Sequence, residues 1–351
     1  MFYNKINKIF KKNSNSVFIV GEISANHNGK IKNIYKIINQ NKKIGLDAIK
    51  VQIYNPNNIT INSNKTDFLL KKNNPWNKYK NLYNLYNKAQ TPKNWYPKIL
   101  SKCKKNNLIL FSSVFDSDTV DFLKKYNCPI YKIASPEITD IPLLKKVART
   151  KKPVIISSGL SKYSDLKLAI STLKNNGCNK IILLKCTSSY PAPINELNLK
   201  TMNNYKKKFN IEIGFSDHSK GNLAAVVAAS NGAKVIEKHI LLDRRKKTID
   251  SFFSSDIHQF KKLVEDVRSV EKILGKVNYT ITKSSKKNIS GKKSIYVFKD
   301  IKKNEKFSKS NIKCVRPHFG LHPRYFNFVI EKRSKKDLYK GDRLKLEYVK
   351  K

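Results

Sequence analysis

Polar and charged residues stand at the ends of eight short apolar runs within the first 241 residues. Lysine ammonium groups neutralise a charged ligand, while serine hydroxyls orient its individual oxygen atoms. The combination therefore predicts a small, multiply charged anion as the ligand, such as a phosphorylated carboxylate. In chain order these residues include Glu22, Lys50, Gln52, Ser113, Lys132, Ser135, Glu137, Ser157, Lys185, Ser188, Tyr190, Ser216, His218, Glu237 and His239.

Two of these residues, His218 and His239, follow neighbouring runs and suit a divalent metal ion with open coordination positions. A single histidine in such a place is more often a hydrogen-bonded core residue, but a pair at matching depth favours the metal. Glu22 has two interpretations: a metal-linked base, or a buried ion-pair partner of Lys50 or Lys132. Buried charges of this kind are unfavourable unless they are paired or bind a ligand.

The apolar runs themselves are rich in Ile, Val, Leu and Phe, as parallel strands are when both faces are buried. Side chains two positions apart in a strand share a face, so Lys50 with Gln52 and Glu237 with His239 would point together into one end of a barrel. The predicted strands span residues 16–24, 47–54, 108–115, 129–135, 153–159, 180–186, 212–217 and 234–241.

Amphipathic segments between these strands predict helices, because apolar residues recur at i, i+3 and i+4. Thr91 and Pro92 predict a helix start, and Gly177 predicts a helix end. The predicted helices span residues 29–44, 91–107, 116–126, 141–149, 162–176, 198–209, 222–231 and 256–274. Eight βα units match a TIM (β/α)₈ barrel in number and size, with a doubly wound sheet as the alternative.

The amino-acid composition of the chain changes after Gly275. Residues 1–15 form an N-terminal extension and residues 16–275 the predicted barrel. Residues 276–293 are polar and rich in Lys, Ser and Asn, which predicts a linker. Residues 294–351 begin with short β-like runs around a Lys-Lys-Asn turn and predict a small β-rich domain. On this pattern alone, that domain would be a stabilising or dimerising appendage.

The chain carries 72 Lys and Arg against 25 Asp and Glu, a formal net charge of +47. Such a charge attracts nucleic acid or an anionic membrane. The lysines are spread over nearly every segment, however, and no RNA-reading motif or recognition helix is evident, so we expect no nucleic-acid partner. No apolar run is long enough for a membrane span. The five cysteines form no CxxC pair, as expected of reduced thiols in the cytoplasm.

Seven motifs between Glu22 and His239 resemble the sialic acid synthase family in order and spacing, and the likeness as a whole spans about residues 16 to 345. Within that family, four segments are most similar to pseudaminic acid synthases: the run GEISANHN from Gly21, residues 82–92, the run KCTSSYPAP from Lys185 and the run RPHFGLHP from Arg316. The seven motifs are EISANHN from Glu22, AIKVQ from Ala48, FSSVF from Phe111, YKIASPE from Tyr131, KCTSSYP from Lys185, GFSDH from Gly214 and EKH from Glu237.

The resemblance implies a TIM barrel followed by a small antifreeze-like (SAF) domain, in a homodimer whose SAF domain from one chain covers the barrel of the other. Arg316 would then act in trans. Glu22 would position or deprotonate water, and Lys132 would join it in catalysis. His218 and His239 would bind Mn²⁺ or Mg²⁺. Phosphoenolpyruvate would be held by Lys50, Ser113, Lys132, Ser135, Ser157, Ser188 and Ser216, and the amino sugar by Gln52, Glu137, Tyr190, Asp250 and Arg316.

The reaction implied by the resemblance is condensation of phosphoenolpyruvate with 2,4-diacetamido-2,4,6-trideoxy-L-altropyranose to give pseudaminic acid. Neuraminate or legionaminate synthesis is the alternative within the family, and a carbohydrate- or ice-binding protein is the alternative outside it. The chain departs from the family pattern in residues 243–250, where a Gly-Gly-Pro-Asp segment is usual. Ser188 stands where some family members have Asn.

Overall fold

The computed structural model describes residues 2–11 and 14–350, which form two compact units, Met1–Gly275 and Lys276–Lys351. In the first unit eight parallel strands close into a barrel, because β8 pairs with β1. The predicted TIM barrel is confirmed, and the doubly wound alternative is wrong. The strands are β1 (Phe18–Glu22), β2 (Ala48–Gln52), β3 (Ile109–Ser113), β4 (Tyr131–Ile133), β5 (Val154–Ser157), β6 (Ile181–Cys186), β7 (Glu212–Asp217) and β8 (Val235–His239).

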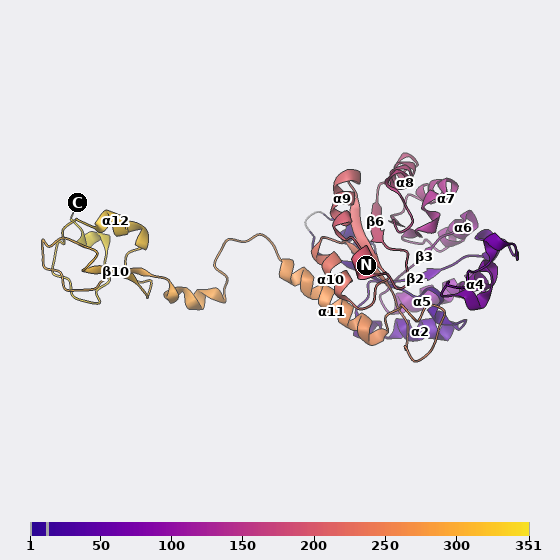
Figure 1. Ribbon diagram of the computed structural model, residues 1–351, viewed down its shortest axis with the longest axis horizontal. Helices are drawn as coiled ribbons and strands as arrows, with labels where there is room; N and C mark the ends of the chain where they lie inside the picture. Colours follow the sequence, from indigo (N-terminus) through magenta and orange to yellow (C-terminus); the bar gives the residue numbers. More distant parts are fainter. Residues whose placement is uncertain (1, 12–13, 351) are drawn as a thin grey trace. The chain divides into compact units, whose positions relative to one another are not determined.

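Helices surround the barrel (Figure 1) and bury their apolar faces against the strands. Gly177, at φ +95°, follows the C-cap of α8 and confirms the predicted helix end. The helices that cover the barrel are α2 (Ile31–Asn39), α3 (Asn41–Ile44), α5 (Tyr96–Lys105), α6 (Ser117–Lys125), α7 (Ile141–Ala148), α8 (Tyr163–Asn175), α9 (Lys200–Phe209), α10 (Leu223–Ser230) and α11 (Ile257–Leu274). A further helix, α4 (Leu82–Ala89), buries Leu85 and Ala89 in a separate small cluster.

Two predicted helices differ from the structure. The helix expected over residues 29–44 is interrupted at Gln40, whose N–H is shared between the carbonyls of Lys36 and Ile37 in a tightened turn. Thr91 is not an N-cap: it is fully buried, its hydroxyl has no hydrogen-bond partner, and its N–H donates to the carbonyl of Gln52. The helix therefore starts later than predicted, at α5.

The N-terminal extension contains a helix, α1 (Phe2–Ile9). Ile6 and Ile9 are 2% and 1% exposed and belong to the hydrophobic core of the barrel unit. Burial of an isoleucine side chain contributes about 1.5–3 kcal/mol. This extension is therefore part of the folded unit.

The strand register places the polar residues of neighbouring strands at one level of the barrel. Glu22 is paired with Lys50 on one side and with His239 on the other, and Ser113 is paired with Lys132. All of these residues lie at or near the C-terminal ends of their strands. This end of a TIM barrel is the one at which active sites form.

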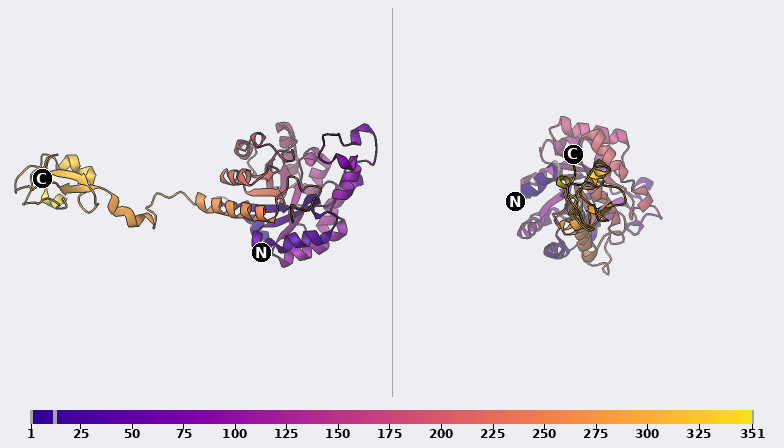
Figure 2. Two further views of the ribbon diagram at one scale, coloured as in Figure 1. Left: turned by 60° about the horizontal axis from the view of Figure 1, so that its bottom comes forward. Right: turned by 90° about the vertical axis from the view of Figure 1, so that its left-hand side faces the viewer.

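The second unit is built on an antiparallel pair, β9 (Ser294–Val297) and β10 (Ile312–Val315), with a short helix α12 (Phe326–Val329). It has a separate core that includes Ile295, Phe307 and Leu344, and it is coloured in orange to yellow in Figure 2. The segment predicted as a linker, residues 276–293, is almost entirely exposed and contains a 3₁₀ helix, Ser285–Gly291.

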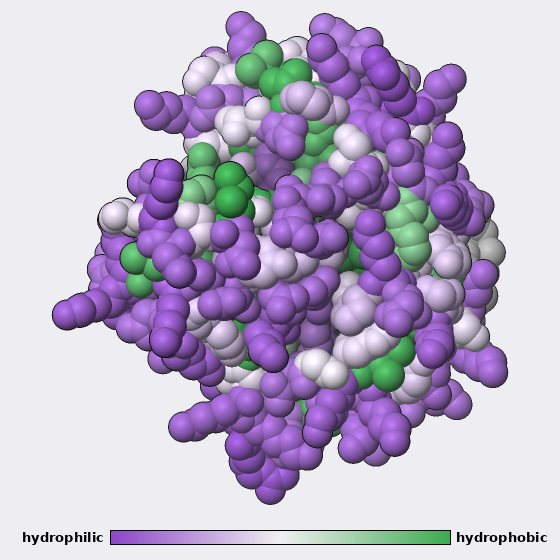
Figure 3. Space-filling view, turned by 90° about the vertical axis from the view of Figure 1, so that its right-hand side faces the viewer, coloured by the Kyte–Doolittle hydropathy of each residue, from purple (hydrophilic) through white to green (hydrophobic). Residues whose placement is uncertain are grey.

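Polar side chains cover most of the face shown in Figure 3, and the hydrophobic residues on it form small separate groups. Within residues 2–11 and 14–350, no helix has both the length and the apolar character needed to cross a membrane.

Candidate active site

A cavity of about 190 Å³ opens among the C-terminal ends of the barrel strands. The resemblance gives fifteen residues a role in catalysis or substrate binding, and eleven of them line this cavity, although they come from seven of the eight strands or the loops that follow them. These eleven are Lys50, Gln52, Ser113, Lys132, Ser135, Ser157, Ser188, Tyr190, Ser216, His218 and His239.

Lys50 connects two buried carboxylates beside this cavity. Its Nζ lies 2.7 Å from Glu22 Oε2 and 3.4 Å from Glu237 Oε1, and it donates a hydrogen bond to Ser113 Oγ at 3.0 Å. Burial disfavours the ammonium form of Lys50, but Glu22 and Glu237 outweigh it and raise the pKa of Lys50. Lys50 is therefore held as a cation although only 3% of it is exposed.

Glu22 itself is fully buried, and burial raises its pKa to about 7 despite the attraction of Lys50. Its Oε1 atom has no hydrogen-bond partner in the described residues. The geometry favours the ion-pair interpretation of Glu22 over direct contact with a metal, since its carboxylate pairs with Lys50. A carboxyl group with a pKa near neutrality is also suited to accept or donate a proton.

Lys132 lies on the other side of Glu237 and is only 2% exposed. Its Nζ donates to Ser157 Oγ at 2.6 Å and lies 4.0 Å from Glu237 Oε1. Burial lowers the pKa of Lys132, and Glu237 opposes this effect. The Glu237 carboxylate is more distant from Lys132 than the two carboxylates are from Lys50, so the positive charge of Lys132 is less completely balanced. An anionic ligand would complete that balance.

Two serine hydroxyl groups lie close to Gly159, which follows β5. Its N–H donates to Ser135 Oγ at 3.0 Å, and a Cβ atom placed on Gly159 would overlap Ser188 Oγ and approach Ser135 Oγ within 2.9 Å. Only glycine lets these two serines come this close to the backbone. The structure thus brings Ser188 to the same side of the cavity as Ser135.

His218 and His239 face each other across the cavity with ring centroids 5.5 Å apart. The Nδ1 atom of His239 is buried and has no hydrogen-bond partner, while His218 Nδ1 contacts the carbonyl of Thr187 at 3.0 Å. Burial lowers the pKa of His239 far below its usual value, so its ring is neutral. A neutral imidazole with a free nitrogen is the form that binds a metal ion, and these residues fit one.

The described residues contain no group of three or more His, Cys, Asp or Glu arranged to hold a metal ion. An ion held by two imidazoles would therefore keep positions for water or substrate.

Aromatic side chains form one wall beside the histidines. Tyr190 packs on His218 with centroids 4.4 Å apart, and Phe253 and Trp76 lie 4.8 Å and 5.6 Å from Tyr190. Trp76 is fixed by a hydrogen bond from its indole N–H to the carbonyl of Ile249 at 3.1 Å. An apolar wall next to a charged pocket suits an organic substrate with both acidic and apolar parts.

Residues 37–279 match the NeuB family, and residues 292–347 match the SAF domain. The chain belongs to the NeuB family. It is 43% identical over 329 residues to a pseudaminic acid synthase of Campylobacter jejuni strain 81-176, covering 94% of this chain and 95% of that one. An N,N'-diacetyllegionaminic acid synthase of Campylobacter jejuni is 34% identical, covering 93% of this chain and 98% of that one.

Among solved structures, an N-acetylneuraminic acid synthetase from Leptospira borgpetersenii in complex with citrate superposes with a TM-score of 0.69. It is 31% identical and covers 78% of this chain and 90% of that chain. The resemblance of the sequence motifs to this family is therefore confirmed, and the NeuB barrel is the fold that positions them.

Four predicted site residues of this NeuB-family chain do not line the cavity: Glu22, Glu137, Asp250 and Arg316. Asp250 is buried and accepts hydrogen bonds from Ser24 Oγ at 2.5 Å and from the N–H of Ala25 at 3.2 Å, which fixes the divergent 243–250 loop to the segment after β1. Arg316 is exposed at the end of β10 in the SAF domain. The roles of these four residues stay predictions.

Two further residues of the NeuB site lacked a predicted role. Glu237 lies between Lys50 and Lys132, and its spacing of two residues from His239 was the signal available in the sequence. Cys186 lines the cavity beside His218, with Sγ 3.8 Å from Nδ1. Burial favours the neutral thiol, but His218 lowers the pKa of Cys186 to about 7. Nothing in the spacing of the five cysteines distinguishes Cys186 from the others.

Proposed function

We propose that the chain is a pseudaminic acid synthase, which condenses phosphoenolpyruvate with 2,4-diacetamido-2,4,6-trideoxy-L-altropyranose and water to give pseudaminic acid and phosphate. The observation that carries this proposal is the 43% identity to a pseudaminic acid synthase over 94% of the chain, nine percentage points above the legionaminic acid synthase. The lysines and serines of the cavity support it, since phosphoenolpyruvate carries both a phosphate and a carboxylate.

In the proposed reaction, Lys50 and Lys132 neutralise phosphoenolpyruvate, and Ser113, Ser135 and Ser157 orient its oxygen atoms. Fixed charges and hydroxyls in a closed cavity stabilise charge that develops during the reaction without having to reorganise. Their positions in this protein, with both lysines at most 3% exposed, are suited to that task.

The proposed reaction forms a C–C bond, adds water and releases phosphate. C3 of phosphoenolpyruvate attacks the aldehyde carbon of the open-chain sugar, and the aldehyde oxygen takes the displaced electron pair and a proton. The new C–C bond leaves positive charge at C2. Water adds to C2, losing a proton, and the tetrahedral product expels phosphate by C–O cleavage. We assign the positioning or deprotonation of this water to Glu22, whose pKa of about 7 lets it accept a proton near neutrality.

A divalent ion, Mn²⁺ or Mg²⁺, would be held by His218 and His239 and would supply Lewis-acid polarisation of the sugar aldehyde. The free Nδ1 of His239 supports this assignment. Glu237, in contact with Ser216 Oγ at 3.4 Å, would keep the surrounding charge balanced.

We further propose a homodimer in which Arg316 of one chain completes the barrel site of the other. Arg316 is exposed at the end of β10 and forms no ion pair with any described residue, which leaves its guanidinium available for a substrate. Refolding a mixture of the inactive Arg316→Ala and His218→Ala chains, so that mixed dimers form, tests this directly. Recovery of up to about one quarter of the activity is expected from mixed dimers, and no recovery would contradict action in trans.

The five cysteines form no disulfide, which agrees with a reducing compartment, and we propose the cytoplasm as the location.

The proposed function is tested by phosphate release from phosphoenolpyruvate with Mn²⁺ and each of three sugars, or none. The sugars are the altrose-derived diacetamido compound, the legionaminic acid precursor and N-acetylmannosamine. We expect release with the first sugar only, lost on chelation and in His218→Ala. Preference for another sugar would make the chain a legionaminate or neuraminate synthase, and no release with any sugar would favour a carbohydrate-binding protein.

A further inference from the structure

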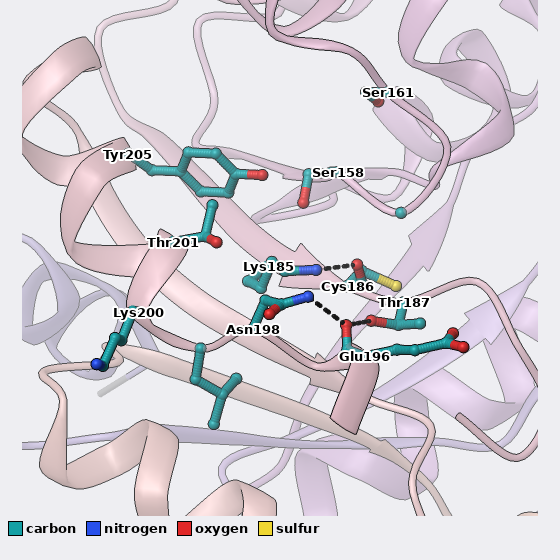
Figure 4. Close-up of a pocket in the computed structure, with 12 residues that line it drawn as sticks. Ser158, Ser161, Lys185, Cys186, Thr187, Glu196, Asn198, Lys200, Thr201 and Tyr205 are labelled. Carbon is teal, nitrogen blue, oxygen red and sulfur yellow. Dashed lines mark hydrogen bonds between the residues drawn. The ribbon is translucent and has the colours of Figure 1, made fainter. Parts of the chain in front are cut away.

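A second cavity, of about 550 Å³, lies beside the proposed active site, between the ends of β5 and β6 and the start of α9. Figure 4 shows the side chains that line it. Cys186 lines both cavities, and Gly159, in the wall of the second, lies against Ser135 and Ser188 of the first. The two spaces are therefore neighbours that share part of one wall.

Lys185 is the cation at the centre of this second cavity. Its Nζ donates to the carbonyl of Cys186 at 2.9 Å (Figure 4), and it forms no ion pair with any carboxylate in residues 2–11 and 14–350. Glu196 also lines the cavity, but its carboxylate extends away from Ser158 and Tyr205 (Figure 4). A half-buried ammonium group without a counter-charge favours an anionic ligand.

Several hydroxyls face the same space. Those of Ser158 and Tyr205 point toward each other, and Thr201 lies beside them (Figure 4). Ser161 Oγ, also in the lining, is shielded from solvent and has no hydrogen-bond partner. An unsatisfied buried hydroxyl is unfavourable, so a ligand oxygen that accepts its hydrogen bond would stabilise the site.

The first turn of α9 borders the cavity through Lys200 and Thr201. This ten-residue helix has no side-chain cap at its N-terminus and no acidic residue in its first turn. The N–H groups of Thr201 and Met202 donate to the carbonyls of Asn198 and Leu199, but the positive end of the helix dipole still borders the cavity and favours an anion. The helix end, the ammonium group and the hydroxyls favour the same class of ligand.

We propose that this second cavity binds a phosphate-like oxyanion through Lys185, Tyr205 and Thr201, next to the active site. The inference rests on the proposed function, in which phosphate is released on the other side of the wall that Gly159 and Cys186 form. The cavity would hold that phosphate after it leaves the reaction. Phosphate then inhibits the enzyme by binding outside the phosphoenolpyruvate site as well as inside it.

The test is calorimetric titration of inorganic phosphate into the full chain saturated with phosphoenolpyruvate, without sugar. Phosphoenolpyruvate blocks the active site, so any phosphate binding that remains reports a second site. Lys185→Gln is expected to weaken this binding by on the order of tenfold or more, because a charge-assisted hydrogen bond is lost. Tyr205→Phe removes one hydroxyl and is expected to weaken it less. Lys167→Gln, at an exposed lysine of α8 that lines neither cavity, is the matched control.

Product inhibition gives an independent readout. Phosphate should be a mixed inhibitor against phosphoenolpyruvate in the unaltered chain and become competitive in Lys185→Gln, with KM for phosphoenolpyruvate changed by less than about twofold. If phosphoenolpyruvate abolishes all phosphate binding, there is no second site. The second site is also wrong if Lys185→Gln and Tyr205→Phe both leave phosphate binding unchanged. If phosphoenolpyruvate itself fails to bind, the proposed function is wrong, whereas phosphate binding that still depends on Lys185 would uphold the second site.

Discussion

Lys50 Nζ lies 2.7 Å from Glu22 Oε2, and the two side chains are 4% and 0% exposed. Lys50 also balances Glu237, so its removal would leave two buried carboxylates with one fewer cation. Loss of Lys50 should therefore destabilise the fold more than loss of one of its carboxylate partners.

Lys50→Met should lower the free energy of unfolding by about 3–5 kcal/mol, since breaking a buried ion pair leaves uncompensated charge. Glu22→Gln should cost less at pH 7, because a pKa of about 7 leaves the Glu22 carboxyl roughly half protonated at that pH. Urea unfolding measures both. Lys146→Met, which removes an exposed pair with Asp121, is the control and should cost under about 1 kcal/mol. Equal losses at Lys50 and Lys146 would contradict the buried network.

Gly159→Ala should raise KM for phosphoenolpyruvate by on the order of tenfold, because the added methyl group would displace Ser188 and Ser135 from the cavity wall. Initial-rate kinetics measure the change. Gly291→Ala, at a glycine with no atom near the position of its added Cβ, is the matched control and should leave KM unchanged. An unaltered KM in Gly159→Ala would show that these serines do not hold the substrate.

His239→Ala should abolish Mn²⁺ binding and activity together, because only His218 would remain as a protein ligand. Electron paramagnetic resonance of free Mn²⁺ follows binding without relying on turnover. His258→Ala, on the exposed side of α11, is expected to change neither. Retained Mn²⁺ affinity in His239→Ala would place the metal elsewhere.

Glu137 provides a prediction for pH. Burial raises its pKa from 4.5 to about 7, although Lys132 acts in the opposite direction. Between these values the folded chain holds a proton that the unfolded chain has lost, so Glu137 makes the fold less stable as pH rises from about 4.5 to 7.

Glu137→Gln lacks this titration. Its free energy of unfolding, relative to the unaltered chain, should therefore rise by on the order of 2 kcal/mol across that window. Urea unfolding at several pH values measures the difference, and Glu265→Gln, at an exposed carboxylate of α11, controls for the loss of one charge. A difference for Glu137→Gln that stays constant with pH would contradict the raised pKa.

The sequence by itself determined the barrel and most of the cavity. Buried parallel strands leave continuous apolar runs, and chain geometry puts residues such as Lys50, Lys132 and His239 at the same ends of those strands. The local sequence pattern wrongly predicted a helix start at Thr91, because the backbone N–H of Thr91 donates to the carbonyl of Gln52, which is far from it in sequence. The short helix α4 was missed although Leu82, Leu85, Tyr86 and Ala89 recur at helical spacing.

Only the tertiary structure decided which charges meet. Glu237 balances both lysines because barrel closure sets β8 across from β2 and β4, and no spacing along the chain encodes a distance of 3.4 Å or 4.0 Å. The pairing of β5 with β6 sets the ends of these strands beside α9, which creates the second cavity around Lys185. Sequence periodicity shows which face a side chain occupies, whereas its partner, burial and pKa depend on strands that fold from distant parts of the chain.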